Sequence, residues 1–179
     1  MSAMSLPHAL LTALIERPSS GSDLAARFDR SIGYFWNATH QQIYRELARL
    51  ETAGLIESLP EQSGRGRKRA YRILPPGRAE LERWVSEGEA APPLRDELMV
   101  RLWAEAAIGP VGLIDLVRRR RDQHRDKLAL YERFMARDYP EVPTDRALAL
   151  RRLVLKAGIA HERLWTEFLD EAEAVLTRP

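Results

Sequence analysis

The sequence contains no cysteine, which excludes disulfide bonds, thiolate catalysis and thiolate metal sites. It also lacks any apolar run close to the ~18 residues that a membrane-spanning helix needs. Residues 1–18 carry neither a positively charged start nor a small-residue cleavage site, so a signal peptide is not expected. We therefore predict a cytoplasmic protein that does not associate with membranes.

Sequence motifs for catalysis and for cofactor binding are also missing. The histidines do not have the spacing of metal ligands; they are His8, His40, His124 and His161. A glycine-rich phosphate loop, a Ser-x-x-Lys motif and a nucleophile elbow are absent as well. We expect no enzymatic activity, no metal and no cofactor. A small enzyme with unrecognised chemistry would need a cleft holding two titratable groups with displaced pKa values.

What the sequence does contain fits a globular protein of one large or two small domains. It has 179 residues, of which 45% are apolar and 30% charged, with a formal net charge of +2. The charge is unevenly distributed, because residues 64–72 hold five basic residues and no acidic one. A local basic excess of this kind favours polyanionic partners.

The order of predicted elements indicates a winged helix-turn-helix. Apolar periodicity and capping signals predict three helices, over residues 5–17, 20–32 and 39–53. Two short strands follow, near residues 55–60 and 70–74, around a glycine-rich tip, and a fourth helix begins at Pro75. Beyond residue 89 the pattern is helical only. We predict a mainly α fold with one small β-hairpin: a winged helix-turn-helix domain, 1–88, and an all-helical domain, 89–179.

The third predicted helix has an unusual outer face. Thr39 and Gln42 form a capping box at its start, and Gly54 stands where a left-handed C-cap is wanted. Opposite its apolar side lie glutamines and arginines, which can form bidentate pairs with adenine and guanine. We predict that Gln41, Gln42 and Arg45 read bases, and that Thr39, Tyr44 and Arg49 contact the DNA backbone.

The tip of the predicted hairpin is basic. Glycines allow close backbone approach, and arginines suit phosphates or a narrow minor groove. The predicted wing contacts are Arg65, Arg67, Lys68 and Arg69. Two alternatives remain open for the helix and the tip together: an ordinary solvated surface, or a winged-helix module that docks proteins without DNA readout. Protein docking predicts little salt dependence, whereas DNA binding predicts a strong one.

The first 85 residues or so resemble the N-terminal domain of PadR-family transcriptional regulators. The residues that carry the resemblance are Gly21, Leu24, Phe35-Trp36, Ile43-Tyr44, Leu47, Leu50, Gly54-Leu55-Ile56, Tyr71 and Gly77. Gln42 and Arg45 stand where the family has serine and proline, so operator preference is expected to differ. The later LRDELMVRLWAE and the long helices after it resemble the larger-tailed branch of the family. The resemblance implies a homodimeric repressor with a pseudo-palindromic operator, released from DNA by a small aromatic effector.

The C-terminal half is less specific. Its helices carry apolar stripes that either form a dimer contact or cover each other within one chain. The run Arg118-Arg119-Arg120-Arg121 is predicted to be a solvated face that pairs with Asp115, Asp122 and Asp126. Candidates for an effector pocket are Trp103, His161 and Trp165, with core packing as the alternative. The operator, the regulated genes, the effector's identity and the sign of regulation are left open by the sequence.

Overall fold

The computed structural model of the chain describes residues 5–30, 38–60, 69–88 and 95–178. The chain divides into two compact units, Met1–Ala91 and Pro92–Pro179, which are described separately below. Within the described ranges, no helix is both long enough and apolar enough to cross a membrane.

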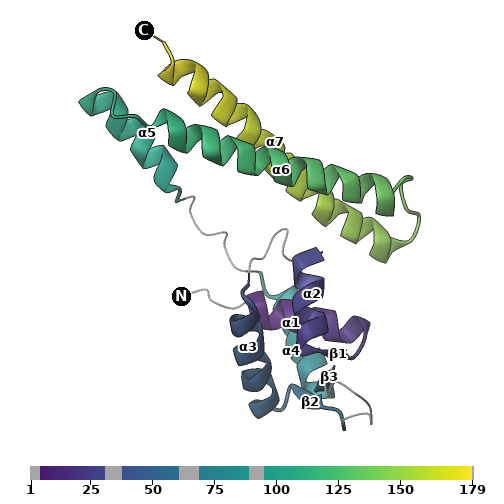
Figure 1. Ribbon diagram of the computed structural model, residues 1–179. Coiled ribbons are helices and arrows are strands. Elements are labelled where there is room, and N and C mark those ends of the chain that lie inside the picture. The colour runs from purple at the N-terminus through teal and green to yellow at the C-terminus, as the bar shows by residue number, and fades with distance from the viewer. Residues whose placement is uncertain (1–4, 31–37, 61–68, 89–94, 179) are drawn as a thin grey trace. The chain divides into compact units, whose positions relative to one another are not determined.

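The N-terminal unit has the element order of a winged helix-turn-helix (Figure 1), as the sequence predicts. Its elements are α1 Ser5–Glu16, β1 Ser19–Ser20, α2 Gly21–Arg30, α3 His40–Thr52, β2 Ile56–Ser58, β3 Ala70–Ile73 and α4 Pro75–Ser86. Strands β2 and β3 form the expected antiparallel hairpin, with Ile56 opposite Ile73 and Ser58 opposite Tyr71. The mainly α fold class is confirmed.

One strand was not predicted. β1 pairs antiparallel with β3 and makes a three-stranded sheet of order β1-β3-β2. A strand of two residues is too short to show an alternating apolar pattern. In the sequence, Ser20 is already explained as the residue that caps α2. Its hydroxyl accepts a hydrogen bond from the Asp23 amide at 3.1 Å, which caps the start of α2.

The helices and the sheet of this unit share one apolar core. The largest fully buried side chains in it, each no more than 2% exposed, are Leu10, Leu11, Leu14, Leu24, Phe28, Ile43, Leu47, Leu50 and Ile56. They come from α1, α2, α3 and β2, so burying the core fixes α3 against the rest of the unit. Because α3 contributes only one face to this core, its opposite face is free for other uses.

Local sequence signals place both ends of α3. Gln42 donates its amide to the Thr39 hydroxyl at 3.3 Å, and its side-chain oxygen accepts from the Thr39 amide at 2.8 Å. At the other end Gly54 has φ of +69°, and the Leu55 amide donates to the Leu50 carbonyl at 3.0 Å. The predicted capping box and left-handed stop are both confirmed.

Gly77, in the first turn of α4, allows a close approach between backbones. A Cβ atom added there would lie 2.2 Å from the carbonyl oxygen of Leu55, which also accepts a hydrogen bond from the Leu74 amide. We expect Gly77→Ala to lower the free energy of unfolding by about 1–3 kcal/mol, because a backbone oxygen cannot move aside cheaply. Urea denaturation measures this loss. Gly88→Ala is the matched control, since nothing lies within 4 Å of its Cβ position. Equal stability of the two variants would contradict the close approach.

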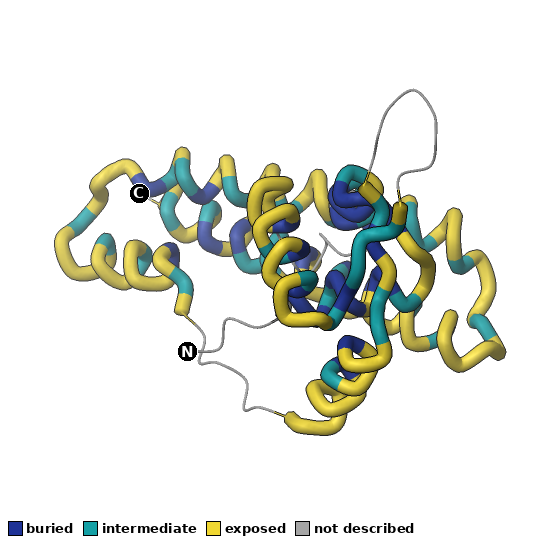
Figure 2. Tube along the Cα trace, turned by 90° about the horizontal axis from the view of Figure 1, so that it is seen from below, coloured by how far each residue is buried: buried dark blue, intermediate teal, exposed yellow. Residues whose placement is uncertain are grey.

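The C-terminal unit consists of α5 Glu97–Ile108, α6 Ile114–Asp138 and α7 Arg146–Leu176. Helices α6 and α7 lie side by side along much of their length (Figure 1). A small core joins all three helices; its buried residues are Leu98, Leu113, Val117, Leu169 and Ala172. The apolar stripes of α6 and α7 therefore cover each other in part, although long stretches of all three helices remain exposed (Figure 2).

The arginine run at the start of α6 is partly neutralised, as predicted, but mainly by other partners than those predicted. Arg118 and Arg121 bond to Glu173 on α7, and Arg120 donates to Asp96 at 2.9 Å. Only Asp122, which accepts from Arg121 at 3.1 Å, was anticipated. The main partners are remote in sequence, so a search at three- and four-residue spacing misses them. The Arg120 guanidinium, through its hydrogen bond, lowers the pKa of Asp96.

Candidate nucleic-acid interface

Helix α3 presents two contrasting faces. Ile43, Leu47 and Leu50 are buried. The side chains predicted to contact DNA are all exposed; they are Thr39, Gln41, Gln42, Tyr44, Arg45 and Arg49. The structure thus brings these residues together on one solvent-facing surface that begins at the helix N-terminus, where partial positive charge favours anions.

Gln41 and Arg45 lie one turn apart on this face. Within the described part of the chain, neither side chain forms a hydrogen bond or an ion pair. Their donors and acceptors are therefore available to a ligand without breaking an internal contact. Side chains of these two types, spaced by four residues on a helix, reach neighbouring base edges in a major groove.

Gln42 is engaged. Its side-chain oxygen accepts from the amide of Thr39 and also from the Thr39 hydroxyl, at 3.1 Å. A bidentate pair with adenine needs both the oxygen and the amino group of a glutamine. The capping box therefore leaves Gln42 only its amino group for base readout.

Arg49 forms an ion pair on the helix itself. Its Nε donates to Glu46 at 2.8 Å, and this hydrogen bond is the main cause that raises the pKa of Arg49. About half of the Arg49 side chain remains exposed. A half-exposed, partly neutralised guanidinium suits a phosphate oxygen better than it suits a base edge.

Tyr44 lies against the start of α2. A Cβ atom added at Gly21 would come within 2.3 Å of the Tyr44 ring, so the absence of a side chain at Gly21 makes room for the tyrosine. The ring is nevertheless 49% exposed. This contact packs an α3 side chain directly against the first turn of α2.

The predicted wing is only partly described. Arg65, Arg67 and Lys68 lie outside the described residues, whereas Arg69, at the start of the returning strand, is described and exposed. Its Nη2 donates to both carboxylate oxygens of Glu51, at 2.8 and 2.9 Å. Its guanidinium also lies 5.6 Å from the centre of the Tyr71 ring. Burial raises the pKa of the Tyr71 hydroxyl.

Of the three aromatic residues predicted to line an effector pocket, the structure brings together His161 and Trp165 but not Trp103. Trp165 on α7 stacks on His124 of α6 with ring centres 5.4 Å apart, and His161 lies 6.4 Å from Trp165. Trp103 is different, because it is 80% exposed on α5. His124 was not predicted to belong to this aromatic cluster; its Nδ1 forms a hydrogen bond with the buried Glu162.

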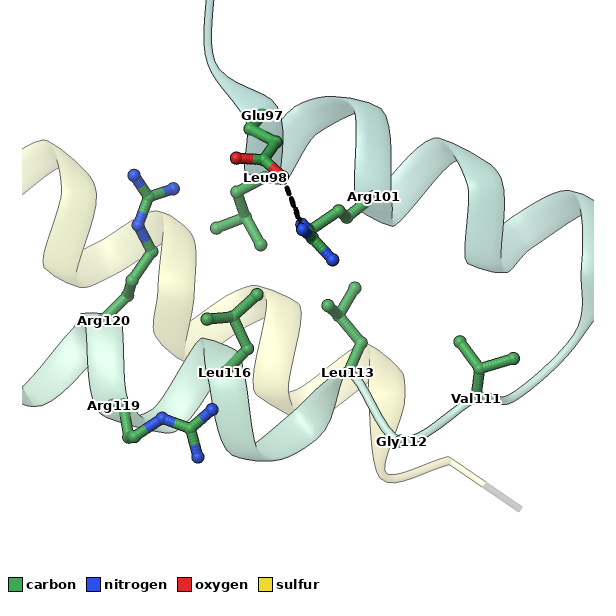
Figure 3. A pocket seen from close by; sticks show the side chains of 9 residues that line it. All are labelled: Glu97, Leu98, Arg101, Val111, Gly112, Leu113, Leu116, Arg119 and Arg120. Atoms are coloured by element: carbon green, nitrogen blue, oxygen red, sulfur yellow. Dashed lines mark hydrogen bonds and ion pairs between the residues drawn. The ribbon is translucent and has the colours of Figure 1, made fainter.

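A cavity of about 530 Å³ lies between the first turns of α5 and α6 (Figure 3). Side chains of Leu98, Leu113 and Leu116 point into it from the two helices. Three arginines also line it. Arg101 pairs with Glu97 and Arg120 pairs with Asp96, while Arg119 has no partner among the residues that the structure describes. No sequence signal singled out Arg119 from its neighbours in the arginine run.

The fold and the exposed polar face of α3 define a winged-helix protein with an appended helical unit. Residues 10–83 match the model of the transcriptional regulator PadR-like family, and residues 94–177 match that of the virulence activator alpha C-terminal domain. A protein of Mycobacterium tuberculosis named as a probable transcriptional regulator is 38% identical, over 97% of this chain and 98% of its own. The chain belongs to the PadR-like family of transcriptional regulators.

Solved structures agree with this assignment. The virulence activator AphA of Vibrio cholerae is 32% identical and superposes with a TM-score of 0.82, covering 96% of this chain and 98% of its own. Bacillus subtilis PadR in complex with operator DNA is 24% identical, with a TM-score of 0.79 and the same coverage. PadR has also been solved with p-coumaric acid. The matched family and its curated relatives are transcriptional regulators and not enzymes, as the sequence predicts for this chain.

Proposed function

We propose that the protein is a cytoplasmic repressor that binds a pseudo-palindromic DNA operator as a homodimer. The observation that carries the proposal is the exposed face of α3, on which Gln41 and Arg45 form no hydrogen bond or ion pair within the described chain. The operator complex of Bacillus subtilis PadR, a protein named as a negative transcriptional regulator, supports it.

Each residue of the α3 face has a proposed role. Gln41 and Arg45 read base edges, and the amino group of Gln42 adds one donor. Thr39, Tyr44 and Arg49 hold phosphates, and Arg65, Arg67 and Lys68 add wing contacts. Residues 1–88 form the DNA-binding domain, and residues 89–179 serve dimerisation and effector binding.

A gel shift on the duplex upstream of the protein's own gene tests this function. We expect a complex that survives an excess of unrelated duplex, because specific sites are bound about 10³–10⁷ times more tightly than others. Deleting the gene should raise expression from that promoter. Equal competition by unrelated DNA would favour the alternative, a protein-docking winged helix, and lower expression on deletion would indicate an activator.

Helix α5 supports the homodimer, because it is apolar on two sides. Leu98 and Leu102 face the core of the C-terminal unit. A second stripe at helical spacing is exposed, with Val100 62% and Trp103 80% accessible. An exposed apolar stripe of this kind commonly marks a protein–protein contact. We propose that a second copy of the chain covers the exposed stripe. The resulting dimer also has the second α3 helix that binding to two half-sites needs.

The effector is proposed to bind in the cavity between α5 and α6. Its volume falls within the ~300–1,000 Å³ of small-molecule sites, and leucines line it beside a cation that has no partner in the described chain. A cavity lined by leucines next to such a cation suits an aromatic carboxylate. The structure of Bacillus subtilis PadR with p-coumaric acid, which is such a molecule, supports this class of ligand.

Arg119→Gln tests the effector site. With p-coumaric acid as the probe, we expect the concentration needed to release DNA to rise roughly fivefold or more, because one charge-assisted hydrogen bond is lost. Fluorescence anisotropy of a labelled upstream duplex measures the release. Lys127→Gln, with the same charge change two turns along α6, should leave the response unchanged. An unaltered response of Arg119→Gln would remove this residue from the site.

A further inference from the structure

Glu51 stands at a position where a carboxylate is unfavourable on two counts. It lies in the last turn of α3, where the helix dipole disfavours negative charge. It is also on the helix that is proposed to enter a DNA groove, where a carboxylate repels phosphates. A residue that is costly for both reasons calls for a compensating interaction.

The structure provides such an interaction, since Glu51 contacts both strands of the hairpin. On β2, the Ser58 amide donates to Oε1 of Glu51 at 3.1 Å. Ahead of β3, Arg69 donates to both oxygens, and the same Nη2 reaches the Ser58 hydroxyl at 3.0 Å. One carboxylate, one guanidinium and one serine thus connect α3, β2 and the start of β3.

The position of these contacts along the hairpin matters. Ser58 opposite Tyr71 is the outermost residue pair of β2 and β3, and the Leu59 amide donates to the Ala70 carbonyl just beyond it. Glu51 therefore holds the hairpin at its outer end and not at its base. A tie at the outer end restricts the angle between hairpin and helix far more than a tie near Ile56 would.

We propose that Glu51 is a positioning residue, which sets the direction of the β2–β3 hairpin relative to α3 so that helix and wing contact one DNA duplex together. Arg69 acts through Glu51 and is not itself a phosphate contact. The inference rests on the proposed DNA-binding function. Its consequence runs against simple electrostatics: removing a negative charge from the DNA-facing helix weakens binding.

The test measures binding of a fluorescein-labelled upstream duplex to the full-length protein at several salt concentrations. For Glu51→Ala we expect the affinity for DNA to be about three- to tenfold lower, because one or two phosphate contacts are lost. The slope of log K against log salt should become shallower by about 1.

Glu51→Gln keeps an acceptor for the Ser58 amide and should lose less affinity than Glu51→Ala. Glu57→Gln, which neutralises a β2 carboxylate paired with Arg72, is the control and should bind as well as the wild type or better.

A double-mutant cycle separates positioning from direct contact. Because Arg69 acts through Glu51, Arg69→Met should weaken binding to a similar degree, and the double variant should lose no more than either single one. Additive losses would show that Arg69 holds phosphate directly. Wild-type affinity or tighter binding by Glu51→Ala would overturn the proposal.

Hydrogen exchange tests the same tie without DNA. The Ser58 amide should exchange faster in Glu51→Ala than in the wild type, because its acceptor is gone. Unchanged exchange at Ser58 refutes the tie even where DNA binding is normal. Failure of the wild type to bind the duplex, with faster exchange in the variant, refutes the proposed function instead.

Discussion

Trp103→Glu is expected to convert the protein from a dimer to a monomer in solution. The indole is 80% exposed in one chain, on the exposed apolar stripe of α5, and large aromatic side chains of this kind dominate protein interfaces. A carboxylate there would have to be buried unpaired against the second copy. Light scattering after gel filtration should show about 41 kDa for the wild type, twice the 20.5 kDa of one chain, and the mass of one chain for the variant.

The same change should lower operator affinity by roughly 10²–10⁴-fold, because the second half-site is no longer bound as part of the same particle. Val142→Glu is the control: it places the same charge at a 70% exposed apolar residue between α6 and α7, outside the stripe. A Trp103→Glu protein that kept the dimer mass and full affinity would show that α5 is not the interface.

Arg45→Ala is expected to lose about 1–3 kcal/mol of operator binding and to relax the preference at one base pair. The reason is that Arg45 forms no hydrogen bond or ion pair within the described chain and is spaced one turn from Gln41 on the outer face. Competition with a set of duplexes, each changed at one base pair, measures both effects. Lys127→Ala, which removes one positive charge from α6, should leave the pattern of preference as it is. A uniform loss on every duplex would indicate that Arg45 only holds phosphate.

Local features of the sequence predicted the N-terminal unit well. Thr39, Gln42 and Gly54 act within a few residues of themselves, so the capping box and the stop of α3 could be read directly. Apolar spacing at Ile43, Leu47 and Leu50 fixed which face of α3 is buried. The two-residue strand β1 was missed because it exists only through pairing with β3, about fifty residues further along the chain.

The state of each site residue could not be predicted in the same way. The sequence predicts that Gln42 both caps α3 and reads a base. Only the structure shows that its side-chain oxygen is already engaged by Thr39. Arg69 and Arg120 look like free cations in the sequence, yet their partners are Glu51 and Asp96, which lie 18 and 24 residues away along the chain. Ion pairs between remote residues depend on tertiary packing, which periodicity does not report. For the same reason Arg119, which has no partner in the described chain, could not be told from the arginines beside it.

Two copies of α3, each with its hairpin, are proposed to bind one DNA duplex. The affinity of the full-length protein for the upstream duplex, measured over a range of salt concentrations, tests this claim most directly. We expect log K to fall linearly with log salt at about −0.9 per neutralised phosphate, with the several phosphates that two half-sites provide. Affinity that did not change with salt, or no binding even at very low ionic strength, would contradict the account.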